Sequence, residues 1–278
     1  MNELTGDPRY TMGRDKEETD RLIQQSRLYD GLTRQLFNDA GIRSGMKVLD
    51  IGSGAGDVSL ILAELVGPEG KVIGVDGNAE ILETAGARAK EAGFANVEFL
   101  AGDARMLELA GDFDALVGRL VLMYMADPAA ALKHLTQRLR PGGIVAFEET
   151  DFTIYRSSSR PDTPLMNKLA EWLLAVFERS GAHVAMGSDL YRTFVEAGLP
   201  EPVLHFEAPM GGSETWAGYP YIANSFRSLL PLLEEFGIVT AEEVDVNTLA
   251  ERVRKEIVAS KYPVVLAPHI TARAKVAT

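Results

Sequence analysis

The stretch of sequence that decides the fold is VLDIGSGAG, residues 48–56. Its apolar start is typical of a short buried β-strand, and three glycines follow before a segment whose apolar periodicity predicts a helix. Glycines let the backbone turn sharply, and a ligand can then lie against helix N–H groups and the positive end of the helix dipole. This stretch therefore predicts a strand–loop–helix unit that binds a small molecule.

Alternating strand-like and helix-like segments surround this loop. The strands are expected at 46–51, 71–75, 96–100, 113–117 and 144–148, and the helices between them at 57–66, 79–92 and 128–139. Five apolar strands with intervening helices predict a parallel sheet with helices on both faces. Right-handed crossovers wind such a sheet into a Rossmann-like α/β fold.

Less regular segments flank this region. An irregular arm and an amphipathic helix are expected within 1–40, and helices at 164–179, 189–197 and through most of 213–260. Strand-like residues return at 202–207 and 264–276. Because no internal repeat or low-complexity linker interrupts the chain, we expect a single domain, 1–278. Its core is 41–151, and the segments 152–200 and 211–262 are expected to form a helical cap over the substrate.

Composition excludes several classes of function. The chain has 278 residues, of which 46 % are hydrophobic and 24 % charged, as in an ordinary globular protein. It has no cysteine, so disulfides, thiolate metal sites and cysteine nucleophiles are absent. The net charge of −12 argues against duplex nucleic acid as a partner. The absence of a long apolar run and of a signal-like N-terminus predicts a cytoplasmic protein without a membrane partner.

Two classes of ligand use a glycine-rich loop of this kind. A dinucleotide site needs G-x-G-x-x-G, but Asp57 stands where the third glycine would be. Asp50 would also repel a pyrophosphate, whereas a cofactor with an ammonium group would favour a carboxylate there. An oxidoreductase that binds NAD(P) is therefore the alternative rather than the first interpretation.

The pattern Asp50-x-Gly52-x-Gly54-x-Gly56 resembles motif I of the class I S-adenosylmethionine (SAM) dependent methyltransferases. Further motifs follow in that family's order: Asp76 matches its ribose-binding acid, 102–104 (GDA) its adenine-contacting step, 113–119 its fourth-strand motif and 139–143 (LRPGG) its turn before the fifth strand. The resemblance covers 40–150 well and the pair 202–207 and 269–276 more loosely.

The resemblance implies a mostly parallel seven-stranded sheet with an antiparallel last strand, SAM as cofactor and S-adenosylhomocysteine as product. It also implies a set of cofactor-binding residues: Asp50, Gly52, Ser53, Gly54, Gly56, Asp76, Gly77, Asp103, Ala104 and Arg119. For Asp50 the alternative is an acid that only holds the backbone of the motif in place. In the N-terminal arm, Tyr10, Met12 and Arg14 precede a helix that in the family often folds over the cofactor. A disordered arm is the alternative.

Methyl transfer from a sulfonium is an in-line displacement, so a general base is needed only when the acceptor must lose a proton. Candidates for such a base are Tyr124, Glu148 and His183, although a place in the pocket wall or behind it is the simpler interpretation of each. Glu149 and Asp151 follow the same strand, and His269, like His183, falls in a segment that could line the acceptor pocket. The alternative for Glu148, Glu149 and Asp151 is a divalent metal site like that of catechol-type relatives. No metal is expected, because the Asp-Asn pair that those relatives carry after this strand is absent and the four histidines show no ligand spacing.

The absence of certain motifs and of cysteine excludes several classes of methyl acceptor. No Asn-Pro-Pro-Tyr or Asp-Pro-Pro-Tyr run follows the fourth strand, which disfavours amide or base-amine methylation, and the lack of cysteine excludes a covalent cytosine adduct. The cap segments are rich in apolar and aromatic residues, so we expect a small, partly apolar acceptor that is methylated on oxygen, nitrogen or carbon. A non-catalytic SAM-binding or SAM-fold protein is a further alternative, and a homodimer is left open.

Overall fold

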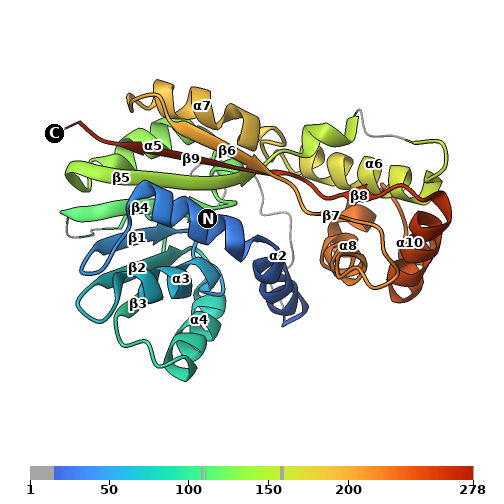
Figure 1. Cartoon of the computed structure of the whole chain (residues 1–278), viewed down its shortest axis with the longest axis horizontal. Coiled ribbons are helices and arrows are strands. Elements are labelled where there is room, and N and C mark those ends of the chain that lie inside the picture. Colours follow the sequence, from blue (N-terminus) through green and yellow to red (C-terminus); the bar gives the residue numbers. More distant parts are fainter. Residues whose placement is uncertain (1–15, 108, 110, 157–159, 278) are drawn as a thin grey trace.

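The computed structural model describes residues 16–107, 109, 111–156 and 160–277 (Figure 1). Its centre is a seven-stranded sheet in the order β3-β2-β1-β4-β5-β9-β6. The parallel strands are β1 Lys47–Ile51, β2 Lys71–Asp76, β3 Val97–Ala101, β4 Phe113–Arg119 and β5 Leu139–Thr150. Strand β9, His269–Lys275, runs antiparallel to both its neighbours, β5 and β6 (Val203–Glu207). The expected Rossmann-like fold with an antiparallel last strand is confirmed.

Helices cover both faces of the sheet because successive residues of its strands point to opposite sides. Val48 packs with one apolar cluster, beside α2 (Lys16–Ala40) and α3 (Asp57–Val66), and α4 (Ala79–Glu91) packs along β3. Leu49 packs with the other, beside α5 (Pro128–Thr136) and α7 (Met186–Glu196). Each face of the sheet thus has its own buried core.

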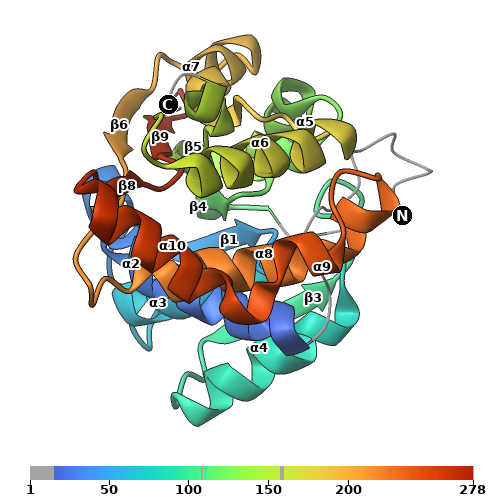
Figure 2. The same ribbon diagram turned by 90° about the vertical axis from the view of Figure 1, so that its right-hand side faces the viewer.

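A helical lobe lies beside the sheet, at the right of Figure 1 and facing the viewer in Figure 2. It consists of α6 (Pro164–Arg179), α8 (Gly218–Glu235), α9 (Ala241–Val244) and α10 (Val246–Ser260). A two-stranded ribbon of β7 (Met210–Gly211) and β8 (Val264–Val265) connects α8–α10 to the sheet. Two 3-10 helices, η1 (Leu122–Tyr124) and η2 (Phe152–Arg156), follow β4 and β5.

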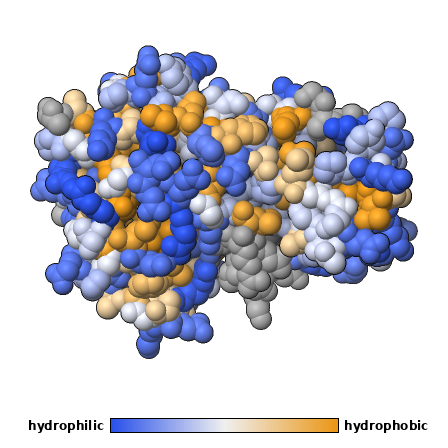
Figure 3. Space-filling model, viewed as in Figure 1, coloured by the Kyte–Doolittle hydropathy of each residue, from blue (hydrophilic) through white to orange (hydrophobic). Residues whose placement is uncertain are grey.

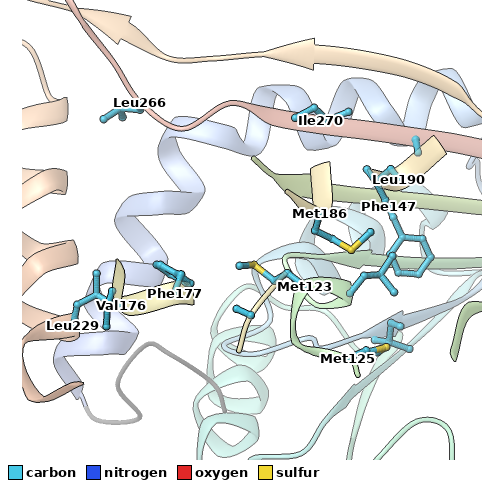
Figure 4. Packing of buried hydrophobic residues seen from close by; sticks show 14 of the residues in the cluster. Met123, Met125, Phe147, Val176, Phe177, Met186, Leu190, Leu229, Leu266 and Ile270 are labelled. Atoms are coloured by element: carbon cyan, nitrogen blue, oxygen red, sulfur yellow. The ribbon is translucent and has the colours of Figure 1, made fainter. Parts of the chain in front are cut away.

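Apolar side chains join the lobe to the sheet. Figure 4 shows Leu229 of α8 beside Val176 and Phe177 of α6, while Met123 and Met186 lie toward the sheet; all five belong to one buried cluster. Because this cluster is continuous, burial of apolar surface holds the lobe against the sheet. On the face in Figure 3, hydrophilic side chains predominate and apolar ones show between them.

Two details differ from the expectations. The segment 189–197 was expected in the cap, but α7 packs on β5 and β9, because its apolar stripe of Met186, Leu190 and Phe194 is buried against the sheet. Strand β5 begins at Leu139 rather than Ile144, since the turn at 140–143 shifts the register with β4 without ending the pairing.

None of the described helices has the length and apolar character needed to cross a bilayer.

Candidate active site

A cavity of about 360 Å³ lies at the carboxyl ends of the parallel strands and extends beneath the helical lobe. At the sheet end it is lined by loops after β1, β2, β3 and β4, among them 52–55, 76–78, 102–105 and 119–121. At the lobe end its lining is largely apolar and includes Met166, Leu169, Leu173, Phe177, Ile222, Phe226, Leu229 and Leu266. The cavity therefore has a polar, glycine-rich end and an apolar end.

The three motif glycines have different functions in the loop. Gly52 adopts φ +67°, and a Cβ there would lie 2.6 Å from Cγ2 of Val121. Gly54 adopts φ +51° with open space beside it and lines the cavity. Gly56 is not among the lining residues; a Cβ there would lie 3.1 Å from Cβ of Ala85, so this glycine lets α3 and α4 pack closely. The structure thus gives Gly56 a packing role in place of the expected ligand contact.

Asp50 is also placed differently from the expectation. Its side chain is buried outside the cavity lining, and its Oδ2 accepts a hydrogen bond of 2.6 Å from Oγ of Ser59 on α3. Burial raises the pKa of Asp50 to about 7, against the lowering effect of the Ser59 hydrogen bond. Because the side chain of Asp50 points to the α3 face of the sheet, its carboxyl group joins β1 to α3 and does not reach the cavity.

Ser53 and Asp76 both lie at the polar end of the cavity. Ser53 lines the cavity, and its buried Oγ has no hydrogen-bond partner among the described residues. Asp76 accepts 2.9 Å and 2.8 Å hydrogen bonds from the backbone N–H groups of Gly54 and Asn78, one on each carboxylate oxygen. A carboxylate oxygen can accept more than one hydrogen bond, so Asp76 holds two loops together and can still bind a ligand. Gly77 lies beside it in the lining.

Asp103 and Ala104 line the same end of the cavity, and Asp103 is paired with a residue that the sequence analysis missed. Oδ2 of Asp103 lies 2.6 Å from Nη2 of Arg105, and Oδ1 accepts a 2.9 Å hydrogen bond from Nε. Nε2 of His134 lies 2.9 Å from the backbone oxygen of Arg105. If Asp103 contacts a ligand, it does so with a carboxylate that is already paired with the guanidinium of Arg105.

Arg119, at the end of β4, connects the cavity to helix α2. Its side chain is 9 % exposed, and its Nη1 donates hydrogen bonds to Oγ1 of Thr33 at 3.0 Å and to Oδ1 of Asp30 at 3.3 Å. Thr33 itself donates a 2.6 Å hydrogen bond to Oε2 of Glu148. Arg119 lines the cavity, but its hydrogen bonds join β4 to α2, and Thr33 continues the network to Glu148 on β5.

The candidates for a general base occupy different positions. Tyr124, at the end of η1, lines the cavity. His183 does not line it. Its Nε2 lies 2.9 Å from the backbone oxygen of Met125, and its backbone N–H donates a hydrogen bond to the backbone oxygen of Met123. His183 thus supports the loop after β4 from outside. Glu148 is fully buried, and its Oε1 lies 2.6 Å from Nδ1 of His269, which does line the cavity.

The other two acids near the end of β5 hold backbone segments in place. Oε1 of Glu149 accepts hydrogen bonds from the backbone N–H groups of Val121 and Leu122, and burial raises its pKa to about 8. Asp151 accepts hydrogen bonds from Thr153 and Ser188. No group of three or more acidic or histidine side chains suited to a metal ion occurs in the described ranges. Tyr10, Met12 and Arg14 lie outside them.

Comparisons with known proteins agree with this arrangement. A family model described as a methyltransferase domain matches residues 42–198. Demethylmenaquinone methyltransferase from Staphylococcus aureus is 32 % identical over 168 residues, which are 55 % of this chain and 66 % of that protein. The match thus spans just under two thirds of that relative's length.

Solved structures share the fold at lower identity. The YcgJ protein from Bacillus subtilis has a TM-score of 0.56 and 19 % identity, over 89 % of this chain and 99 % of that one. A putative methyltransferase from Bacillus halodurans gives the same TM-score and identity, over 88 % and 99 %. The match to the family model ends before α8, so the lobe helices α8–α10 and strand β9 lie outside it.

Proposed function

The chain belongs to the methyltransferase domain family, in its class I SAM-dependent form, and we propose that it transfers the methyl group of SAM to a small, partly apolar acceptor. The observation that carries this proposal is the continuity of the cavity. One end offers glycine backbone, Ser53 and Asp76, and the other end is apolar. A cofactor and an acceptor can therefore meet in one continuous cavity.

The polar end fits SAM in its chemistry. The unpartnered Oγ of Ser53 needs a polar ligand, the open space beside Gly54 admits one close to the backbone, and the Asp76 carboxylate suits neighbouring ribose hydroxyls. The cofactor would be held by Gly52, Ser53, Gly54, Asp76, Gly77, Asp103 and Ala104. When bound, SAM supplies an electrophilic methyl group on a positively charged sulfur.

The protein's part in the reaction is mainly positioning and exclusion of water. Met123 and Tyr124, in the 3-10 helix after β4, line the cavity. Apolar side chains of α6 and α8, among them Leu169 and Phe226, cover the acceptor end. Holding an acceptor in line in a dry site supplies much of the acceleration that a displacement of this kind needs.

The lobe end favours an acceptor with an apolar body and a polar reacting group. Its lining is apolar except for a few groups, which include Tyr155, Tyr221 and Ser225. The relative from Staphylococcus aureus is named for methylation of demethylmenaquinone, and an acceptor of that general kind, a polar ring with an apolar substituent, suits this lining. The net charge of −12 supports a substrate other than duplex nucleic acid.

Calorimetric titration with SAM, S-adenosylhomocysteine, NAD⁺ and NADP⁺ tests the cofactor. We expect binding of the first two alone; binding of a nicotinamide cofactor without SAM would overturn the proposal in favour of an oxidoreductase. Release of S-adenosylhomocysteine with a panel of phenols, quinols, amines and carbon acids then tests the activity. SAM binding without turnover of any acceptor would favour a non-catalytic SAM-binding protein.

A further inference from the structure

We propose that His269, oriented by Glu148, is the general base of the methyl-transfer site, and that the acceptor carries an acidic O–H group, a phenol or an enol. This inference rests on the proposed function and specifies its acceptor. His269 lies on β9, outside the residues that match the family model.

Strand pairing brings the two side chains together. His269 pairs with Thr150 across the β5–β9 ladder, and Glu148 lies two residues from Thr150 on the same face of β5. Diagonal neighbours on one face of a sheet are within reach of each other's side chains. Nδ1 of His269 accordingly lies 2.6 Å from Oε1 of Glu148, with both side chains almost fully buried.

The hydrogen bonds around Glu148 determine the tautomer of His269. Burial opposes ionisation of Glu148, but the hydrogen bonds from His269 and Thr33 and the charge of Arg119 hold its pKa below the ordinary value. An ionised carboxylate only accepts hydrogen bonds, so Nδ1 of His269 must carry the proton. The lone pair is then on Nε2, the nitrogen that Glu148 does not engage.

The same surroundings keep the imidazole neutral. Burial lowers the pKa of His269, as does the charge of Arg119, while Glu148 and Glu207 act in the opposite direction. A neutral imidazole with a free lone pair can accept a proton near neutral pH, whereas an imidazolium cannot. His269 lines the cavity, so this lone pair belongs to a residue of the site itself.

The ring is also fixed in position. Tyr29 stacks on His269, with 3.5 Å between ring centroids and 7° between ring planes. The Tyr29 hydroxyl donates a 3.3 Å hydrogen bond to the backbone oxygen of Ala267. A general base must face a ligand site and keep a fixed orientation, and the cavity and the stacked Tyr29 meet these two conditions for His269.

The transfer step balances with these groups. The acceptor O–H gives its proton to Nε2 of His269 while its oxygen bonds to the methyl carbon. The electron pair of the broken carbon–sulfur bond goes to sulfur. The products are a methyl ether, the neutral thioether S-adenosylhomocysteine and an imidazolium, whose positive charge lies beside the Glu148 carboxylate until the proton passes to water.

The first test compares methyl transfer to phenol and to 4-nitrophenol, which is already ionised at mildly alkaline pH and so needs no base. At such a pH and saturating SAM, His269→Gln should lower kcat for phenol by about a hundredfold or more and kcat for 4-nitrophenol much less. Glu148→Gln should show the same pattern more weakly, and His205→Gln, which alters an exposed histidine on β6, should match the wild type. Equal losses for the two acceptors in His269→Gln, or no transfer to either by the wild type, would overturn the inference.

Calorimetry separates this inference from the proposed function. All variants are expected to bind S-adenosylhomocysteine within about threefold of the wild type, a difference below 1 kcal/mol. Failure of the wild type to bind it would overturn the proposed function instead. A second measurement needs no variant: nitrogen-15 NMR of the histidines near pH 7 should show a neutral ring protonated on Nδ1 for His269. A ring protonated on Nε2, or on both nitrogens, would contradict the assignment.

Discussion

Val121, on the loop after β4, packs directly against Gly52, on the loop after β1. A Cβ on Gly52 would lie 2.6 Å from Cγ2 and 2.9 Å from Cβ of Val121, and the backbone of Gly52 has φ +67°. Two loops that form the polar end of the cavity are therefore in contact at a position that accepts no side chain.

The variant Gly52→Ala should accordingly lose both stability and cofactor affinity. A methyl group there must displace Val121 and adopt a strained backbone, which together cost about 1–3 kcal/mol. We expect S-adenosylhomocysteine to bind at least about tenfold more weakly by calorimetry. Gly86→Ala on α4, where a Cβ meets nothing within 4 Å, is the matched control and should be at least as stable as the wild type. Normal affinity in Gly52→Ala would contradict the close contact.

Replacement of Asp76 tests the ribose assignment. Asp76→Ala removes the acceptor for Gly54 and Asn78 N–H groups together with the proposed hydroxyl contacts, so SAM affinity should fall by about tenfold or more, or about 1.4 kcal/mol. Asp189→Ala, which removes an exposed acid from α7, should leave affinity unchanged. Unchanged affinity in Asp76→Ala would show that this carboxylate does not bind the cofactor.

Glu149 should make the folded state less stable as the pH rises. Its pKa is about 8 in the folded protein because of burial, against an ordinary value of 4.5, so the folded state retains a proton that the unfolded chain releases. The contribution of this carboxyl is therefore fully present below pH 4.5 and is lost as the pH rises through about 8.

The variant Glu149→Gln keeps an acceptor for Val121 and Leu122 but does not titrate. Urea unfolding at several pH values between about 5 and 8 should show a smaller loss of stability for this variant than for the wild type. Over that range, the wild type is expected to lose on the order of a few kcal/mol more of its free energy of unfolding than the variant. Some slope should persist, because Asp50, with its pKa raised to about 7 by burial, acts in the same direction. Identical slopes would contradict a protonated Glu149.

A larger side chain at Ala170 should shorten the acceptor end of the cavity. Ala170 lines the cavity from α6, while Ala175 lies on the same helix outside the lining. With 4-alkylphenols of increasing chain length, wild-type affinity should rise by up to about 0.8 kcal/mol for each buried CH₂ group. Ala170→Phe should weaken this dependence and leave S-adenosylhomocysteine binding intact, whereas Ala175→Phe should preserve both. A chain-length dependence that is the same in all three proteins would place the acceptor elsewhere.

The sequence predicted the sheet and the loops at its carboxyl edge, because apolar runs and glycine positions are local signals. It did not show which motif residues face the cavity: Asp50 and Gly56 belong to the motif but turn toward α3 and α4. The pairing of Glu148 with His269 was equally out of reach, since 121 residues separate the two and only the β5–β9 ladder brings them together. Arg105 was missed because no recognised motif marks its pairing with Asp103.

The ribbon of β7 and β8 has a consequence for how proteins with this architecture can diversify. Met210 pairs with Val265 and Gly211 with Val264, so residues 212–263 leave this ribbon and return to it at adjacent points. An insertion whose two ends already touch can be lengthened, shortened or exchanged while β6 and β9 keep their pairing. Evolution can thus alter the helices α8–α10 as one interchangeable unit and redirect the enzyme to new acceptors while the loops around Ser53 and Asp76 stay the same.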